Sequence, residues 1–245
     1  MISDEELTAR IEPFDSFWEA PVDIEGGYRS VGRYYRHNYL PFMPDDPDAR
    51  ILVISCGPGY MLNALRKSGF TDVRGIDSDP EKVRLAASRG LDARQARAFA
   101  YLNATTEPFD LIFAEQEINH LTKSEIVEFL VACRENLVPG GALIIHSVNA
   151  ANPLTGSESR AGNFDHYNSF TDHSLRQILK HTGFVEPTAI ALNLYVFYAN
   201  PFNYVAWALV TLSFAFFRVY YRLLGKTTKI YTKKIGAIGY TPPAT

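Results

Sequence analysis

Cysteine is scarce in this sequence of 245 residues, and the two that occur, Cys56 and Cys133, lie far apart. A disulfide framework or a cysteine-rich zinc site requires several cysteines at characteristic spacings, so we exclude both. The first residues, MISDEELTARIEPFD, are acidic, whereas a secretory signal begins with a basic region followed by an apolar one. We therefore expect a protein of the reducing cytoplasm.

Acidic residues are absent from the last quarter of the chain, since no Asp or Glu follows Glu186. The basic residues of this segment are Arg218, Arg222, Lys226, Lys229, Lys233 and Lys234. Because the whole chain has a net charge of −3 and this segment carries +6, residues 1–186 carry −9. Nucleic-acid binding requires a basic surface on the folded body, so we expect no nucleic-acid partner. The basic and apolar end instead indicates an anionic or apolar partner.

Short apolar segments alternate with helical ones from about residue 49 onward. Four segments have the composition of strands buried in a parallel sheet: residues 51–55, 73–77, 109–114 and 142–148. Helices are predicted for residues 60–68, for 79–90, from the Thr122–Glu125 capping box to the turn at Pro139-Gly140-Gly141, and from Thr171 to His181. This order predicts an α/β fold with a doubly wound, mostly parallel sheet over residues 49–245. Residues 1–48 are expected to form an arm of lid helices.

A glycine-rich loop, SCGPGY (55–60), follows the first predicted strand, and Asp77 ends the second. In doubly wound folds, ligands bind beyond the carboxyl ends of the strands. Gly57 and Gly59 permit a tight turn and close backbone approach, and the next helix N-terminus offers free N–H donors. The Asp77 carboxylate can accept both ribose hydroxyls of an adenosine. The alternative is that the glycines serve only the turn.

The residues after the loop discriminate between nucleotide ligands. A dinucleotide-binding loop has a third glycine where this sequence has Met61 and Leu62, which weakens the case for NAD. A P-loop requires a Lys-Ser/Thr pair after its glycines, and this loop has none.

Four motifs in order resemble the class I S-adenosylmethionine-dependent methyltransferases: ILVISCGPG (51–59), GID (75–77), FDLIFA (109–114) and LVPGGALII (137–145). The resemblance implies a Rossmann-like methyltransferase fold whose seven-stranded sheet has an antiparallel last strand. It also implies S-adenosyl-L-methionine as cofactor and S-adenosyl-L-homocysteine as its product. The cofactor-binding residues that it implies are Ser55, Cys56, Gly57, Gly59, Tyr60, Asp77, Ser78, Arg97, Ala98, Glu115 and Gln116. Residues 98–179 are most similar to bacterial methyltransferases associated with cell-surface polysaccharide biosynthesis.

The sequence departs from the family pattern at four positions. Val53 replaces an acid of the first strand, Ser55 the first glycine of the loop, Arg97 an aspartate near the adenine, and Asn119 the glutamate before His120. A non-catalytic relative that binds the cofactor or acts as a scaffold therefore remains the alternative to an enzyme.

Histidine suits the removal of a proton from an acceptor hydroxyl, because its ordinary pKa lies near working pH. His120 follows the strand at 109–114, and His166 lies in the loop sequence GNFDHYN. We expect His120 as the first candidate for the general base and His166 as the second, with Glu117 and Asp165 next. Each histidine could instead hold its loop through hydrogen bonds to the backbone.

Other reactive side chains are expected to be structural. His146 lies inside a predicted strand, and Cys56 is interpreted as a small packed residue rather than a nucleophile. His120, His166 and Asp165 do not make a typical metal cluster, so no metal is expected.

Residues 201–225 form a very apolar insert before the last predicted strand. Residues 202–217 form a run of 16 residues without a charged side chain. A helix that spans a bilayer requires a run of about 20 apolar residues, so this run is shorter. Residues 228–241 should form the antiparallel last strand, which a spanning insert would leave on the wrong side of the membrane. We therefore predict that 201–226 contact a membrane surface, with a homodimer interface or packing on the acceptor pocket as alternatives.

With the resemblance, these observations predict S-adenosylmethionine-dependent O-methylation of a sugar hydroxyl in a surface glycan or its lipid-linked precursor. A methyltransferase that acts on a small aromatic or quinone-like lipid is the alternative enzyme, and it would equally explain the apolar insert. Either enzyme is expected in the cytoplasm, peripheral on the inner face of the membrane.

Overall fold

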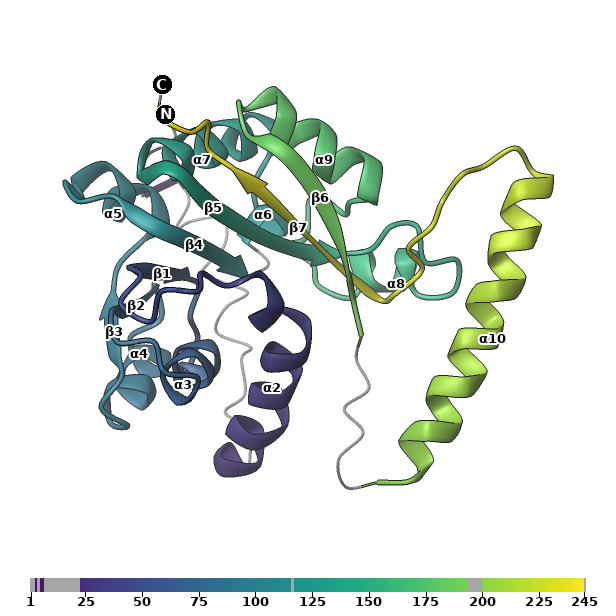
Figure 1. Ribbon diagram of the computed structural model, residues 1–245, viewed down its shortest axis with the longest axis horizontal. Coiled ribbons are helices and arrows are strands. Elements are labelled where there is room, and N and C mark those ends of the chain that lie inside the picture. The colour runs from purple at the N-terminus through teal and green to yellow at the C-terminus, as the bar shows by residue number, and fades with distance from the viewer. Residues whose placement is uncertain (1–2, 4, 7–22, 116, 194–199, 245) are drawn as a thin grey trace.

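A seven-stranded sheet forms the centre of the molecule (Figure 1). The computed structural model describes residues 3, 5–6, 23–115, 117–193 and 200–244. The strands are β1 (Ile51–Ile54), β2 (Val73–Asp77), β3 (Asp92–Gln95), β4 (Phe109–Glu115), β5 (Leu137–Val148), β6 (Val185–Leu192) and β7 (Lys234–Tyr240). Their order is β3-β2-β1-β4-β5-β7-β6, and β7 runs antiparallel to both of its neighbours. The predicted mostly parallel sheet with an antiparallel last strand is confirmed.

Helices cover both faces of this sheet (Figure 1). From residue 23 onward, the helices of the described residues are α2 (Ile24–Asn38), α3 (Tyr60–Lys67), α4 (Pro80–Ala87), α5 (Ala98–Ala104), α6 (Glu117–His120), α7 (Lys123–Glu135), α8 (Gly156–Ala161), α9 (Asp172–His181) and α10 (Phe202–Leu223), with a 3-10 turn at Leu40–Phe42. Helix α10 does not cover the sheet (Figure 1). One apolar core lies between the sheet and α2, α3 and α4. A second core lies between the sheet and α5, α7 and α9.

Local sequence explains the ends of several elements. All four residues of β1 are buried, because both faces of this strand are covered. Thr122 and Glu125 form the predicted capping box at the start of α7. The Asp79 side chain accepts hydrogen bonds from the first backbone N–H groups of α4, and Pro80 begins that helix.

The structure corrects the sequence-based boundaries around two strands. Helix α7 ends at Glu135, and β5 begins at Leu137, so Pro139-Gly140-Gly141 lies within a strand rather than ending a helix. The pairing of β4 with β5 shifts register at this point, and Gly140 has a φ of +78°. A proline is tolerated at this irregularity, although its nitrogen cannot donate a hydrogen bond to the neighbouring strand. The last strand begins at residue 234 rather than 228.

The apolar insert forms α10, which stands apart from the layered body (Figure 1). This helix has 22 residues and is therefore about 33 Å long. By length and composition α10 could cross a membrane, so the argument that the insert is too short was wrong. The topological argument remains, because Leu192 of β6 pairs with Lys234 of β7. The strands that flank α10 thus lie side by side.

Candidate active site

The loop after β1 turns at Gly57 and Gly59, whose φ angles are +53° and +86°. A Cβ atom at Gly59 would lie 2.7 Å from Leu91 Cδ1 and 2.9 Å from Ala86 Cβ, whereas one at Gly57 would have nothing within 4 Å. Gly59 is therefore required for packing behind the loop. At Gly57, by contrast, the space that a Cβ would occupy is open.

Ser55 precedes this turn in a backbone conformation that non-glycine residues rarely adopt. Its φ is +55°, in the left-handed region where a side chain costs about 1–2 kcal/mol. The Ser55 hydroxyl donates a hydrogen bond to Glu117 at the start of α6. This contact ties the loop after β1 to the helix after β4.

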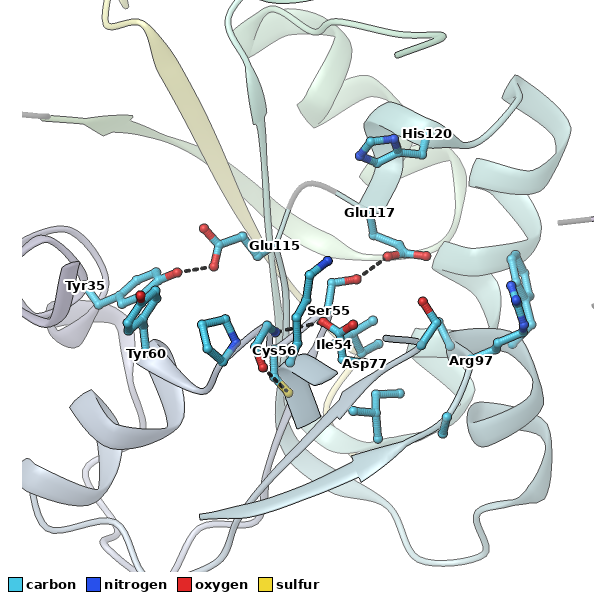
Figure 2. Close-up of a pocket in the computed structure, with 18 residues that line it drawn as sticks. Tyr35, Ile54, Ser55, Cys56, Tyr60, Asp77, Arg97, Glu115, Glu117 and His120 are labelled. Carbon is cyan, nitrogen blue, oxygen red and sulfur yellow. Dashed lines mark hydrogen bonds between the residues drawn. The ribbon is translucent and has the colours of Figure 1, made fainter. Parts of the chain in front are cut away.

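Asp77 ends β2 beside the loop, and its side chain is buried. One carboxylate oxygen accepts a hydrogen bond from Gly57 N at 2.8 Å (Figure 2), and the other accepts one from Asp79 N at 3.0 Å. Each carboxylate oxygen can accept a second hydrogen bond. Two backbone donors therefore fix the position of the Asp77 carboxylate beside the loop.

A cavity of about 360 Å³ lies above these residues (Figure 2), within the range of about 300–1,000 Å³ for small-molecule sites. Ten of the residues named from the sequence line it: Ser55, Cys56, Gly57, Tyr60, Asp77, Ser78, Arg97, Ala98, Glu115 and His120. Gly59 is not in the lining, for the packing reason given above. Gln116 lies outside the described residues.

Cys56 lines the cavity with a thiol that is not activated. Burial raises the pKa of Cys56 far above its ordinary value of 9.0, and the negative charge of Asp77 adds to this effect. A thiolate is the nucleophilic form of cysteine, so this side chain is suited to packing. Indeed, a Cβ on Gly75 would lie 2.7 Å from Cys56 Sγ.

Glu115, at the end of β4, lines the cavity and is held by a buried network of polar side chains. The Tyr35 hydroxyl, from α2, donates a hydrogen bond to Glu115 (Figure 2). His146 Nε2 lies 3.9 Å from the same carboxylate, and His146 Nδ1 lies 3.0 Å from the hydroxyl of Tyr39. Burial raises the pKa of Glu115 and lowers that of His146 well below 6.5.

His120 is placed at the cavity by α6, beside two residues of the loop between α8 and α9. His120 Nδ1 lies 2.9 Å from Asp165 Oδ2, and the Asp165 side chain is only 2% exposed. The His120 and His166 rings are 4.9 Å apart. Burial lowers the pKa of His166, and the nearby His120 adds to this effect. The structure thus gathers both histidines expected from the sequence, together with Asp165.

His166 lines a second hollow rather than the first cavity. This hollow has a volume of about 510 Å³ and is bounded by α8 and the loop that follows it. His120 therefore stands between the cavity beside Asp77 and the hollow beside α8. The two hollows thus adjoin at His120 and His166.

The ligating atoms of His120, Asp165 and His166 lie within 4.8 Å of one another. A divalent cation could be held by three such groups, so the geometry is more favourable to a metal than the sequence indicated. The short contact between His120 and Asp165 is equally the arrangement by which a carboxylate orients a catalytic histidine.

Several lining residues were not expected from the sequence: Tyr35, Lys82, Phe99 and Glu117, the last named only as a reserve base. A signal for the first existed, because Tyr28 and Tyr35 recur at helical spacing in α2, Tyr39 follows at the C-cap, and all three are buried. Lys82 lies in the first turn of α4 and Phe99 in the first turn of α5, and neither has a comparable sequence pattern.

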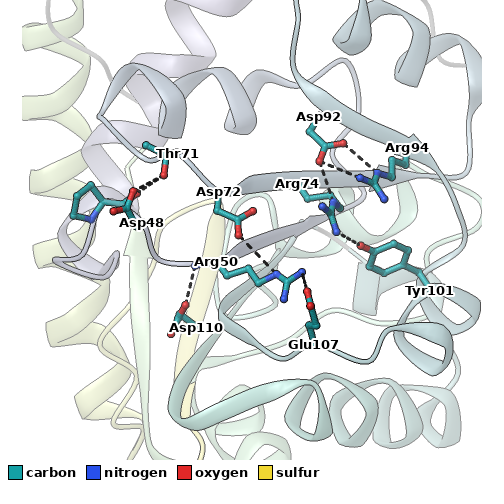
Figure 3. Close-up of polar contacts among 11 residues, drawn as sticks. Asp48, Arg50, Thr71, Asp72, Arg74, Asp92, Arg94, Tyr101, Glu107 and Asp110 are labelled. Carbon is teal, nitrogen blue, oxygen red and sulfur yellow. Dashed lines mark hydrogen bonds and ion pairs between the residues drawn. The ribbon is translucent and has the colours of Figure 1, made fainter.

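A separate group of charged side chains lies among strand β2, edge strand β3 and the neighbouring loops (Figure 3). Arg74 Nε lies 3.0 Å from Asp92 Oδ2, and its guanidinium also lies 3.3 Å from the Tyr101 hydroxyl. Arg50 forms ion pairs with Glu107 and Asp72. None of these residues lines the cavity beside Asp77, so we assign them to the stability of the fold.

The residues of the cavity fit S-adenosylmethionine. Asp77 is a fixed acceptor for a ribose diol, Gly57 leaves the space that a Cβ would fill, and Glu115 presents an acidic group. The arrangement of the sheet and the position of this site define the class: an S-adenosylmethionine-dependent methyltransferase. A family model described as a methyltransferase domain matches residues 28–186. The chain belongs to this methyltransferase domain family.

Solved structures share this fold. A SAM-dependent methyltransferase from Archaeoglobus fulgidus superimposes with a TM-score of 0.65 at 16% identity, covering 87% of this chain and 94% of that one. A phosphoethanolamine N-methyltransferase of Haemonchus contortus, solved with S-adenosyl-L-methionine, has a TM-score of 0.57 at 14% identity, covering 99% of this chain and 60% of that one.

Curated relatives match part of the chain. A ubiquinone biosynthesis O-methyltransferase of Caulobacter sp. (strain K31) is 31% identical over 108 residues, which are 41% of each protein. The enzyme of the same name from Xylella fastidiosa (strain M23) is 31% identical over 149 residues, covering 58% of this chain and 59% of that protein. This chain thus spans between two fifths and three fifths of these relatives.

Proposed function

We propose that this protein transfers the methyl group of S-adenosyl-L-methionine to a hydroxyl of a small aromatic or quinone-like lipid, at the cytoplasmic face of a membrane. Two facts favour this acceptor over the sugar hydroxyl expected from the sequence. The curated relatives reported above are named for ubiquinone biosynthesis, and α10 gives the molecule a large exposed apolar surface.

The cofactor would occupy the cavity beside Asp77. When bound, it supplies an electrophilic methyl group on a sulfonium centre. Asp77 would accept the ribose hydroxyls, and Gly57 would allow close approach of the backbone. Glu115 would accept a hydrogen bond from the amino group of the methionine part, held in place by Tyr35. These residues bind and orient, and none of them reacts.

His120 would remove the proton from the acceptor hydroxyl. Its Nδ1 faces Asp165, which leaves Nε2 as the nitrogen that can accept a proton. The buried Asp165 carboxylate would hold the ring in the correct tautomer and stabilise the imidazolium that forms. His166 would line the acceptor side of the same centre.

The observation that carries the proposal is the position of His120 in the lining of the cavity that Asp77 and Gly57 also line. The test is incubation with methyl-labelled S-adenosylmethionine and two acceptor panels, one of phenolic and quinol lipids and one of sugars and lipid-linked glycans. Label in a phenolic lipid is expected. Label in a sugar alone would favour the glycan acceptor, and cofactor binding without transfer to either panel would favour a non-catalytic scaffold.

A further inference from the structure

None of the 22 residues of α10 is buried in the molecule, although this helix is apolar enough by composition to cross a membrane. Seven large apolar side chains recur at alternating spacings of three and four residues: Phe202, Val205, Leu209, Leu212, Phe216, Val219 and Leu223. Each of them is between 56% and 80% exposed. Helical spacing places them on one stripe, which we call the apolar stripe. Such a surface is costly to leave in water.

A second side of α10 faces the body of the protein. Phe214, Phe217 and Tyr221 surround the ring of Tyr231, with centroid distances of 6.0, 6.3 and 5.5 Å. Tyr231 is 1% exposed, and its carbonyl accepts a hydrogen bond of 2.7 Å from Asn152. Helix α10 therefore packs against the body along this side, and the apolar stripe faces away from the body.

The side of α10 between these two carries interfacial residues. Tyr204, Trp207, Arg218 and Arg222 share this side by helical spacing. Tyrosine and tryptophan are enriched where lipid headgroups meet acyl chains, and arginine attracts anionic headgroups. Because α10 contains no acidic residue, its charge is complementary to an anionic surface.

A membrane-spanning arrangement of α10 conflicts with the sheet. Leu192 and Lys234 are paired neighbours, so the chain leaves and re-enters the body at one point. If α10 spanned, one of its connecting segments would have to cross the hydrocarbon again without a helix, leaving backbone groups without partners in lipid. A helix parallel to the membrane plane requires no second crossing.

We propose that α10 lies flat in one leaflet of an anionic membrane, with the apolar stripe among the acyl chains and the side with Tyr204, Trp207, Arg218 and Arg222 at the headgroups. This inference rests on the proposed function, because it places the enzyme where a lipid acceptor resides. A second copy of the chain would cover the stripe but leave the exposed Tyr204 and Trp207 in water. A lipid surface covers both sides.

The segment that holds α10 against the body also leads to the catalytic centre. Asn149 and Asn152, which hold residues 230–232, belong to the loop that leads from β5 into α8. In Figure 1, α8 lies between the sheet and α10. Leu154, in the loop that leads into α8, is 73% exposed, and Phe164, in the loop after α8, is 86% exposed. Helix α8 and the loop after it bound the hollow beside His166. A lipid acceptor could thus reach His120 from the membrane side through this hollow.

The test is flotation of the full-length protein with vesicles of phosphatidylcholine, alone or with one third phosphatidylglycerol. We expect binding to the anionic vesicles to be about tenfold or more tighter, and to be weakened only in part by salt. Leu209→Ser with Leu212→Ser should abolish flotation, and Arg218→Gln with Arg222→Gln should remove most of the anionic preference. The controls are Val185→Ser, an exposed apolar residue outside α10, and Lys67→Gln with Arg84→Gln, exposed basic residues elsewhere.

Cofactor binding and circular dichroism show that each variant is folded. Absence of wild-type flotation would overturn the inference. So would a wild-type dimer, detected by sedimentation, that the double serine variant dissociates without any change in vesicle binding. Methyl transfer to a detergent-dispersed acceptor is measured in parallel. If transfer persists while flotation fails, only the membrane inference is rejected, and if flotation persists without transfer, only the proposed acceptor is rejected.

Discussion

His120 Nδ1 lies 2.9 Å from Oδ2 of Asp165, although one residue comes from α6 and the other from the loop after α8. The carboxylate is buried, whereas the imidazole also lines the cavity beside Asp77. A buried acid behind an accessible histidine is the arrangement that makes imidazole an effective general base.

The first prediction concerns this pair. His120→Gln should lower kcat by about 10²–10⁴-fold, the usual effect of removing a general base, and Asp165→Asn should lower kcat in the same direction, because an amide cannot stabilise the imidazolium. Cofactor affinity, measured by calorimetry, should stay within a few-fold of wild type for both. If instead cofactor affinity and melting temperature fall while kcat at saturation is unchanged, the pair only holds the loop.

A second prediction distinguishes a histidine–carboxylate pair from a metal site. In keeping with the sequence-based expectation of no metal, dialysis against a chelator should leave methyl transfer unchanged, and metal analysis of the purified protein should find less than one divalent ion per chain. Loss of activity on chelation, restored by one divalent cation and abolished in His166→Ala, would mean that His120, Asp165 and His166 ligate a metal.

Asp77 provides the third prediction. Asp77→Asn retains the shape of the side chain but removes the charge that would accept two ribose hydroxyls. Loss of a charged hydrogen bond costs about 1.5–3 kcal/mol, so the dissociation constant for S-adenosylmethionine should rise roughly ten- to a hundredfold. Asp79→Asn, which keeps an acceptor at the start of α4, is the control and should have little effect. An unchanged affinity in folded Asp77→Asn would place the cofactor elsewhere.

The two loop glycines should respond differently to alanine. Both have a positive φ, but only at Gly59 would a Cβ approach other atoms closely, at 2.7 Å and 2.9 Å. Gly59→Ala should therefore lower the free energy of unfolding by about 1–3 kcal/mol more than Gly57→Ala. Gly57→Ala should mainly weaken cofactor binding. Urea unfolding and calorimetry measure the two effects separately, and equal losses of stability would contradict the assignment.

The free energy of unfolding should depend on pH through the titration of His146. Burial, together with the charge of Lys234, lowers the pKa of His146 well below 6.5, so the unfolded chain binds a proton at a pH where the native chain does not. The contribution of His146 to stability is complete above pH 6.5 and decreases as the pH falls from there through the native pKa. The free energy of unfolding should fall less steeply below pH 6.5 in His146→Gln. Parallel curves would show that His146 titrates normally.

Local patterns in the sequence were sufficient to locate five of the seven strands and to name most of the residues that line the cavity beside Asp77. The seven-stranded sheet itself was implied by the family resemblance, and β6 had not been located. Apolar segments such as 51–55 must be buried on two faces, and Asp77 follows its strand directly. The edge strand β3 was missed because Asp92–Gln95 is polar and largely exposed, so it has no apolar pattern.

Contacts between distant segments had no sequence signal. Asp165 was considered as a reserve base, whereas the structure places its buried carboxylate 2.9 Å from His120 Nδ1, where it would orient the ring rather than accept a proton from the acceptor. Tyr35 reaches Glu115 from α2, and nothing in either segment indicates that they meet. The fastening of α10 through Tyr231 likewise depends on the loop after β5, which no local pattern connects to the insert.

The most direct test of the account is methyl transfer itself. Wild-type protein is incubated with methyl-labelled S-adenosylmethionine and a lipid extract of its host, and the label in the lipid phase is compared with that produced by Asp77→Asn and His120→Gln. The account predicts a labelled phenolic lipid from wild type, and a strong reduction in both variants. Absence of label in every fraction, together with no calorimetric binding of S-adenosylmethionine or S-adenosylhomocysteine, would contradict it.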